Sequence, residues 1–372
     1  MIQACRRTID LVRPSPTMAT TSLHPPAVHA MANHVSNCLE AHRARFSTRS
    51  NYPPLFVGVQ GPQGSGKTFL TSRLRSLLAE PPYSLSVAIL SIDDLYLPHA
   101  GLMALAETHP RNRLLHGRGQ PGTHDVELGN EILKALKAIN DGEGGRGPGQ
   151  VALPVFDKSL FGGEGDRAPR AQVVQGPVDV VVLEGWCVGF YPVRREVVEA
   201  RWCQPVPGLD DFDMQAFVSL EDVLEVNDLL TAYVEWWRAF DVFIQVCILC
   251  VADDECCITQ LQLDQRACDV AIRDRLSMAA ATRAGHEDQE WGTRHDGRTS
   301  EDVRVLFHGC LLAHLARLDS FVDRYIPGYV FFGDGVRRGT VDEEGGRLPP
   351  WHGQGLVVEL DLERRLLSTS QF

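Results

Sequence analysis

The sequence has no uninterrupted apolar run of the ~18 residues that a membrane-spanning helix needs. The longest candidate, residues 240–252, is broken by Asp241 and Gln245. Positive charge is also in deficit, because 36 lysines and arginines stand against 48 aspartates and glutamates, a formal net charge of −12. We therefore expect no membrane partner and no broad nucleic-acid surface, although a local basic pocket could bind a small anion.

A secretory signal is also missing, so the ten cysteines indicate reduced intracellular thiols rather than a disulfide framework. The first fifty residues are poor in acids, with six arginines against only Asp10 and Glu40. This composition fits a mitochondrial presequence. A frayed extension, or a start codon placed too early with Met18 or Met31 as the true start, is the favoured alternative. We expect residues 1–50 to be a disordered extension and the protein to be cytoplasmic, with the nucleus and the mitochondrion left open.

What the chain does contain is an alternation of apolar runs and helical segments. Strand-like apolar runs are found in residues 55–59, 87–92, 178–183, 241–251 and 355–360, and the run at 178–183 has the near-continuous apolar character of a strand buried on both faces. Helical patterns cover residues 69–78, 126–139 and 318–325, and a glycine-rich loop covers 141–150. This alternation predicts an α/β protein with three α/β/α layers around a mostly parallel sheet.

The most specific motif is a Walker A pattern, which directly follows a predicted strand and opens a predicted helix: Gly61-Pro62-Gln63-Gly64-Ser65-Gly66-Lys67-Thr68. Its glycines let backbone N–H groups surround a β-phosphate, and the positive end of the helix dipole faces the same anion. We expect Lys67 to reach the β- and γ-phosphates, the Thr68 hydroxyl to bind Mg²⁺, and Phe69 to complete the nucleotide contacts. ATP and Mg²⁺ are the predicted cofactors.

Carboxylates follow two of the predicted strands. Glu184 ends an apolar strand in the Walker B arrangement, where it would hold Mg²⁺ or a metal-bound water; a solvent-facing acid is the less favoured alternative. Asp93 and Asp94 stand side by side after the strand at 87–92. In an extended chain their side chains point in opposite directions, so both cannot face the γ-phosphate unless the strand has already ended.

These motifs belong to a longer series of segments: "SIDDLYLPHAGL", "NRLLHGRGQPGTHD", "LPVFDKSLFGGEGDR", "VVVLEGWCVGF", "FVDRYIPGY" and "LPPWHGQGLVVELDLERR". In this order they resemble the D-glycerate 3-kinase family of plant and fungal ATP-dependent kinases. That family lies within the uridine kinase, phosphoribulokinase and pantothenate kinase branch of P-loop kinases. The resemblance runs over about residues 55–365. It implies a P-loop kinase domain over residues 51–367, followed by a C-terminal tail at 368–372.

The resemblance also implies ATP-dependent phosphorylation of a small hydroxyl compound and assigns residues to it. Asp93 takes the place of the acid that receives the proton of the attacking hydroxyl, and Lys67 and Glu184 complete the catalytic set. Asp94 is expected to cap the next segment or to support the metal through water. For an anionic acceptor such as D-glycerate, cationic and polar contacts are expected from Asp94, Tyr96, Arg118, His124, Lys158 and Arg167.

One segment departs from the family pattern. After the strand at 241–251 the family has a helix with a Tyr-x-x-Trp-Arg-like segment that supplies lid contacts, and here Arg266 is the nearest substitute. The long polar stretch that follows, to about residue 317, matches nothing in the family, so we expect residues 252–317 to be an atypical, disordered insertion, either real or from a retained intron. A lid arginine contributes orders of magnitude in rate, which makes the activity of this chain depend on that segment.

Three functions are compatible with these residues. The first is a kinase that converts D-glycerate into 3-phosphoglycerate, and the second is a related P-loop kinase with another small acceptor. The third, from a different class, is a nucleotide-dependent switch or assembly ATPase. A switch needs neither a hydroxyl-facing base such as Asp93 nor an arginine-bearing loop, so those two features favour a kinase.

Overall fold

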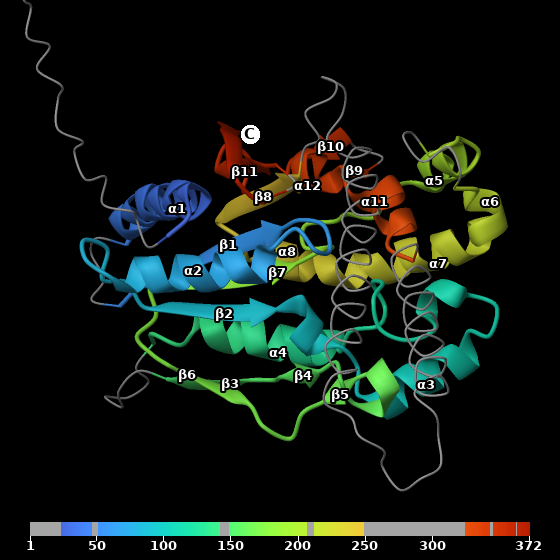
Figure 1. The fold of residues 1–372 in the computed structure, drawn as a ribbon, viewed down its shortest axis with the longest axis horizontal. Coiled ribbons are helices and arrows are strands. Elements are labelled where there is room, and N and C mark those ends of the chain that lie inside the picture. Colours follow the sequence, from blue (N-terminus) through green and yellow to red (C-terminus); the bar gives the residue numbers. More distant parts are fainter. Residues whose placement is uncertain are drawn as a thin grey trace, which may run out of the picture.

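The computed structural model describes residues 24–46, 51–141, 149–206, 212–248, 324–342, 345–361 and 363–372. Within these ranges the centre of the fold is one six-stranded sheet (Figure 1). Its strands are β1 (Leu55–Gln60), β2 (Val87–Ser91), β7 (Val180–Gly185), β8 (Val242–Ile248), β11 (Gly355–Leu360) and β12 (Leu366–Gln371). No helix in the described ranges combines the length and the apolar character that crossing a bilayer requires.

The strand order is β12-β11-β8-β1-β7-β2. Every neighbouring pair from β11 to β2 is parallel, and β12 pairs antiparallel with β11. All six residues of β1 and all six of β7 are buried, which explains their continuous apolar sequence. Because the central strands are parallel, the loops after β1, β2 and β7 all leave the same edge of the sheet, and that edge carries the candidate site.

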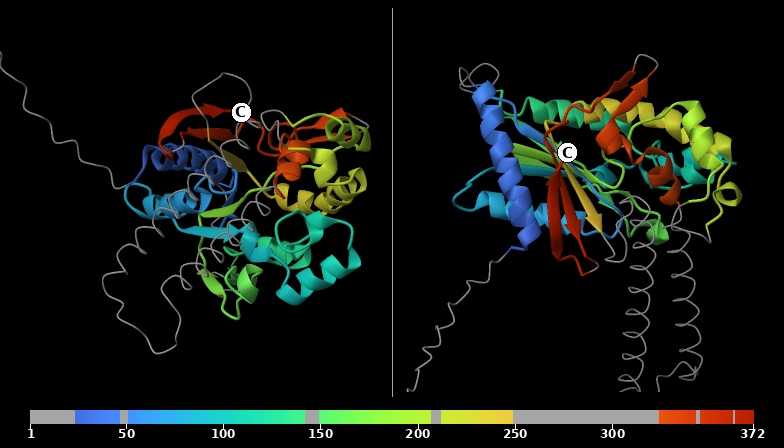
Figure 2. Two further views of the ribbon diagram at one scale, coloured as in Figure 1. Left: turned by 45° about the vertical axis from the view of Figure 1, so that its right-hand side comes forward. Right: turned by 90° about the horizontal axis from the view of Figure 1, so that it is seen from above.

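Helices cover both faces of the sheet (Figures 1 and 2). One face packs against α1 (Pro26–Arg45) and α2 (Lys67–Ala79) in a single apolar core. The other face packs against a larger core with helices that include α4 (Val126–Lys137), α7 (Leu220–Leu230) and α11 (Ile326–Phe332). The predicted three-layer α/β/α fold with a mostly parallel sheet is confirmed.

Smaller elements surround this frame. The remaining α-helices of the described ranges are α3 (His99–Thr108), α5 (Arg195–Trp202), α6 (Met214–Phe217), α8 (Val234–Trp237) and α12 (Gly335–Arg338). Short 3₁₀ helices cover Ile92–Leu95, Arg113–Leu115, Phe161–Gly163 and Thr231–Tyr233. Three two-stranded pairs complete the list: β3 (Gln150–Leu153) with β6 (Gln172–Gln175), β4 (Phe156–Asp157) with β5 (Asp166–Arg167), and β9 (Thr340–Asp342) with β10 (Gly345–Arg347).

Two of the predicted boundaries are wrong. Residues 26–45, expected in a disordered extension, form α1, whose apolar side is buried against the sheet and whose Arg43 pairs with Asp179 at 2.6 Å. Residues 368–371, expected in a C-terminal tail, belong to β12, because they complete the hydrogen bonding of β11 at the sheet edge. The expected insertion at 252–317 and most of the helix predicted at 318–325 lie outside the described residues.

The packing of α1 makes a first prediction. Met31 is on the side of α1 that packs against the sheet, and its side chain is fully buried. Met31→Ala should therefore lower the free energy of unfolding by about 2–5 kcal/mol. Glu40→Ala, on the exposed side of the same helix, should change it by less than about 0.5 kcal/mol. Denaturant unfolding measures both, and equal stability of the two variants would contradict the packing of α1 on the sheet.

Candidate active site

The loop between β1 and α2 has the conformation that phosphate binding needs. Gly64 and Gly66 have φ angles of 73° and 86°, in the left-handed region that favours glycine. At Gly61 a Cβ atom would lie 2.9 Å from the backbone oxygen of Val246, so a side chain has no room there. The Ser65 hydroxyl is buried and has no hydrogen-bond partner among the described residues. An anion with oxygen acceptors fits this loop.

Lys67, the first residue of α2, is buried beside that loop. Its Nζ donates to the backbone oxygen of Pro62 at 2.8 Å, which satisfies one of the three donors of the ammonium group. Burial lowers the pKa of Lys67, and the nearby carboxylates of Glu184 and Asp93 oppose that shift. These three predicted catalytic residues therefore lie in one electrostatic cluster.

Glu184 lies near the end of β7, directly across from the end of β2 in the sheet register. Its Oε1 accepts a hydrogen bond from the Thr68 hydroxyl at 3.1 Å, so the two predicted metal-side residues are in contact. Both offer oxygen atoms, the donors that Mg²⁺ prefers. The residues present fit a magnesium ion held beside the phosphate loop.

Asp93 and Asp94 are not in extended chain, because a 3₁₀ helix (Ile92–Leu95) begins as soon as β2 ends. Asp94 Oδ1 accepts the backbone N–H of Phe156 at 2.9 Å, which fastens β4 to the end of β2. Asp93 Oδ2 instead binds the Nζ of Lys158 at 2.5 Å. The two acids have unequal roles: Asp94 supports the structure, whereas Asp93 faces the cations of the site.

Two aromatic residues and His124 form a wall next to Asp93. The rings of Tyr96 and His124 are stacked, with their centroids 4.4 Å apart. The Tyr233 hydroxyl accepts the N–H of Gly122 at 2.8 Å and shares a second hydrogen bond of 2.8 Å with His124 Nδ1. This contact fixes the orientation of the imidazole ring beside Tyr96.

The state of this wall is set by burial. Burial lowers the pKa of His124 to about 3, although the negative charge of Asp93 opposes the shift. The ring is therefore neutral at physiological pH. Its buried Nε2 has no hydrogen-bond partner among the described residues, so it can form one hydrogen bond to a bound molecule. Burial and the neighbouring Asp93 also raise the pKa of Tyr96, which keeps its hydroxyl protonated.

The two arginines predicted to contact the acceptor have structural partners. Arg118 donates to the backbone oxygens of Gly163 and Glu164 at 2.6 and 2.5 Å. Arg167 donates to the backbone oxygen of Tyr96 at 3.1 Å and to Asp125 Oδ2 at 3.0 Å. Both therefore hold the segment around β4 and β5 against the site. Of the predicted acceptor-binding cations, Lys158 is the one whose charged group touches Asp93.

Several residues that surround this edge have no role predicted from the sequence. Arg324 is largely buried, which lowers the pKa of its guanidinium group, and it donates to the Leu114 oxygen at 3.2 Å. The Tyr329 hydroxyl approaches the oxygen of Gly61 at 3.4 Å. Arg364 donates to the oxygen of Gly64 at 2.6 Å. The segments "FVDRYIPGY" and "LERR" contain these residues, but only the folded structure shows that they lie near the phosphate loop.

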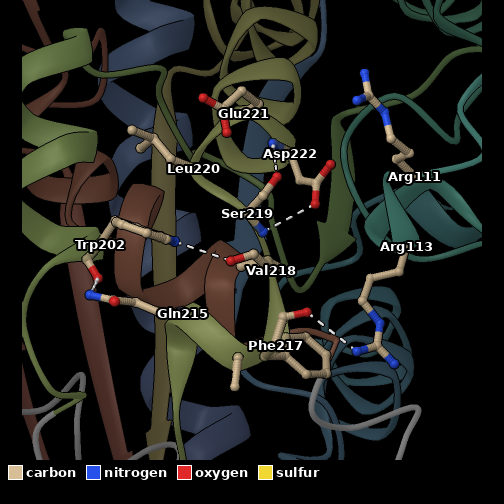
Figure 3. A pocket seen from close by; sticks show the side chains of 11 residues that line it. Arg111, Arg113, Trp202, Gln215, Phe217, Val218, Ser219, Leu220, Glu221 and Asp222 are labelled. Carbon is tan, nitrogen blue, oxygen red and sulfur yellow. Dashed lines mark hydrogen bonds between the residues drawn. The ribbon is translucent and has the colours of Figure 1, made fainter.

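A separate surface pocket of about 430 Å³ lies between Arg111, Arg113 and the start of α7 (Figure 3). Arg113 donates to the oxygen of Phe217 at 3.3 Å and lies over the ring of that residue. The predicted nucleotide and acceptor residues are not among those that line this pocket. It has no part in the chemistry described below.

Comparisons with known proteins place this architecture. No protein-family model matches the chain. The solved structure of D-glycerate 3-kinase from Cryptococcus neoformans is similar over 94% of this chain and 100% of its own, with a TM-score of 0.68 and 31% identity. "Probable ATP-dependent kinase TDA10" of Saccharomyces cerevisiae is 45% identical over 40% of this chain, and the chloroplastic D-glycerate 3-kinase of Arabidopsis thaliana is 34% identical over 53%. The chain spans 50% of the yeast protein and 43% of the plant protein.

A parallel sheet with a phosphate loop after β1, an acid at the end of β7 and an aspartate after β2 defines a P-loop kinase fold. The similarity to the Cryptococcus structure covers that whole chain at more than 30% identity. The protein belongs to the D-glycerate 3-kinase family, as the sequence motifs predicted.

Proposed function

We propose that the protein is an ATP-dependent kinase that transfers the γ-phosphate to a hydroxyl of a small anionic acceptor, with D-glycerate as the leading candidate and 3-phosphoglycerate as its product. The observation that carries this proposal is the position of Asp93. This carboxylate lies beside the buried Lys67 of the phosphate loop and in contact with Lys158. Two relatives named D-glycerate 3-kinase support the choice of acceptor.

The residues divide the reaction between two sides. On the nucleotide side, the loop N–H groups and Lys67 bind the phosphates and neutralise the charge that develops during transfer. On the acceptor side, Asp93 orients the hydroxyl and takes its proton as the oxygen forms a bond to the γ-phosphorus. The bond from that phosphorus to the bridging oxygen breaks, and ADP leaves with the electron pair.

A magnesium ion bound with ATP would be held by Thr68 and Glu184, which share a hydrogen bond at 3.1 Å. When bound, it supplies positive charge to the phosphate oxygens. The Tyr96 hydroxyl and His124 Nε2 border the acceptor side of the site, where they can form hydrogen bonds with the acceptor. A switch protein has no use for a proton acceptor and polar donors on that side.

The proposal is tested by ATP consumption of the purified chain with Mg²⁺ and a panel of hydroxy acids, sugars and nucleosides. We expect a hydroxy acid, with D-glycerate as the leading candidate, to raise the rate of ADP release well above the rate measured without an acceptor. Identification of the phosphorylated product by mass spectrometry checks the transfer. If no acceptor raised the rate of ADP release, the proposed kinase activity would be refuted. A preference for a sugar or a nucleoside would refute the proposal that the acceptor is anionic.

A further inference from the structure

The loop that joins β4 and β5 covers Asp93. Lys158 follows β4 directly, and its Nζ reaches back to Asp93 Oδ2 at 2.5 Å across 65 positions of the sequence. The Lys158 side chain is 53% exposed, whereas that of Asp93 is 18% exposed. The lysine has solvent into which it can move, and the acid, in a short 3₁₀ helix, does not. Any change in this pair is therefore a movement of Lys158.

The rest of this loop is fastened on both sides of Lys158. On one side, Asp94 accepts the N–H of Phe156 at 2.9 Å. On the other, the Glu164 carboxylate lies 2.7 Å from His99 Nε2, and the His99 ring stacks on Phe161 at 3.8 Å. These contacts position the backbone, so Lys158 can exchange partners by rotation of its own side chain without release of the loop.

The pair has a chemical consequence for Asp93. Burial alone would raise the pKa of this carboxyl, but the Lys158 ammonium, together with smaller effects of His124 and Lys67, holds the pKa below its usual value. A carboxylate stabilised in this way is a weaker proton acceptor, and one of its oxygens is occupied. With the pair intact, Asp93 is poorly suited to activate a hydroxyl or a water molecule.

We propose that Lys158 determines the preference for anionic acceptors: it pairs with Asp93 in the empty site and transfers to the negative group of the acceptor, which releases Asp93 for the hydroxyl. A carboxylate can compete for the ammonium because it offers an equivalent charged hydrogen bond. A neutral polyol or water cannot, so the base stays occupied. This inference rests on the proposed function, whose acceptor side it specifies.

The test compares wild type with Lys158→Met on D-glycerate and on glycerol, which replaces the carboxylate by a neutral hydroxymethyl group. We expect kcat/KM for glycerate to fall about a hundredfold, the loss of one charged hydrogen bond. With glycerol kcat/KM should instead rise several-fold, because Lys158→Met frees Asp93 for a neutral acceptor, so the preference for the acid collapses. Lys158→Arg should restore part of the preference for glycerate over glycerol. Lys134→Met, at an exposed position on α4, serves as the matched control.

Two results would overturn the role of Lys158: equal losses on glycerate and glycerol, or unchanged kcat/KM for glycerate in Lys158→Met. A wild type that phosphorylates no acceptor would instead refute the proposed function. In that case the rate of ATP hydrolysis without acceptor tests the role of Lys158. Because Lys158→Met frees Asp93, this background rate should be several-fold higher in the variant than in wild type. An unchanged background would refute the inference as well.

Discussion

Asp93→Asn is expected to lower acceptor-dependent kcat about a thousandfold, within the range for loss of a positioned general base. Asparagine has nearly the same shape as aspartate but cannot accept the hydroxyl proton at neutral pH. The affinity for ATP should stay within about twofold, because the loop residues that bind phosphate are unchanged. Steady-state kinetics with saturating ATP, together with calorimetric titration of a non-hydrolysable nucleotide, measures both quantities.

Asp94→Asn is the matched control, since it alters the adjacent carboxylate in the same 3₁₀ helix. Its Oδ1 accepts one backbone N–H at 2.9 Å, and the amide oxygen of asparagine can accept the same bond. We therefore expect less than about a tenfold loss. If Asp94→Asn were the inactive variant and Asp93→Asn the active one, the assignment of the base would be reversed.

Lys67→Ala is the second change with a large expected effect. The buried ammonium binds the Pro62 oxygen at 2.8 Å, and with nucleotide present we expect it to move to the phosphates. Its loss should reduce kcat/KM for ATP by at least about a thousandfold, because a buried charge aimed at the transferred phosphate contributes more than one neutral donor. Coupled assay of ADP release measures it.

Arg75→Ala, exposed on the same helix, removes a cation without touching the loop and should leave kcat/KM within about twofold. Thermal unfolding of both variants controls for stability. Full activity of a folded Lys67→Ala protein would show that the loop after β1 is not where the reacting phosphate lies. That result would contradict the central part of the site.

Local sequence rules predicted most of the frame. The strands expected at 87–92 and 355–360 are observed as Val87–Ser91 and Gly355–Leu360, and the helix expected at 126–139 as Val126–Lys137. These elements have continuous apolar runs or strong helical periodicity, signals that depend on neighbouring residues only. The phosphate loop was predictable for the same reason: its glycine conformations and backbone donors lie within eight consecutive residues.

The elements that were mispredicted depend on distant partners. The α1 segment has the composition of a solvated extension, and its helix is stabilised by packing on α2 and the sheet. The C-terminal strand β12 is mostly exposed and polar, and it exists because β11 offers an unpaired edge. Neither partner can be inferred from the composition of the segment itself.

The sequence by itself determined the nucleotide side of this protein: the loop from Gly61 to Thr68, the acid at Glu184 and the family. The tertiary structure decided the acceptor side. It directed Asp93 toward Lys158 and Asp94 toward a backbone amide, turned Arg118 and Arg167 into structural contacts, and brought Arg364 to Gly64 across 300 positions. The physical reason is range: phosphate is bound by backbone groups of one continuous loop, whereas ion pairs between separate segments depend on where the folded chain brings them together.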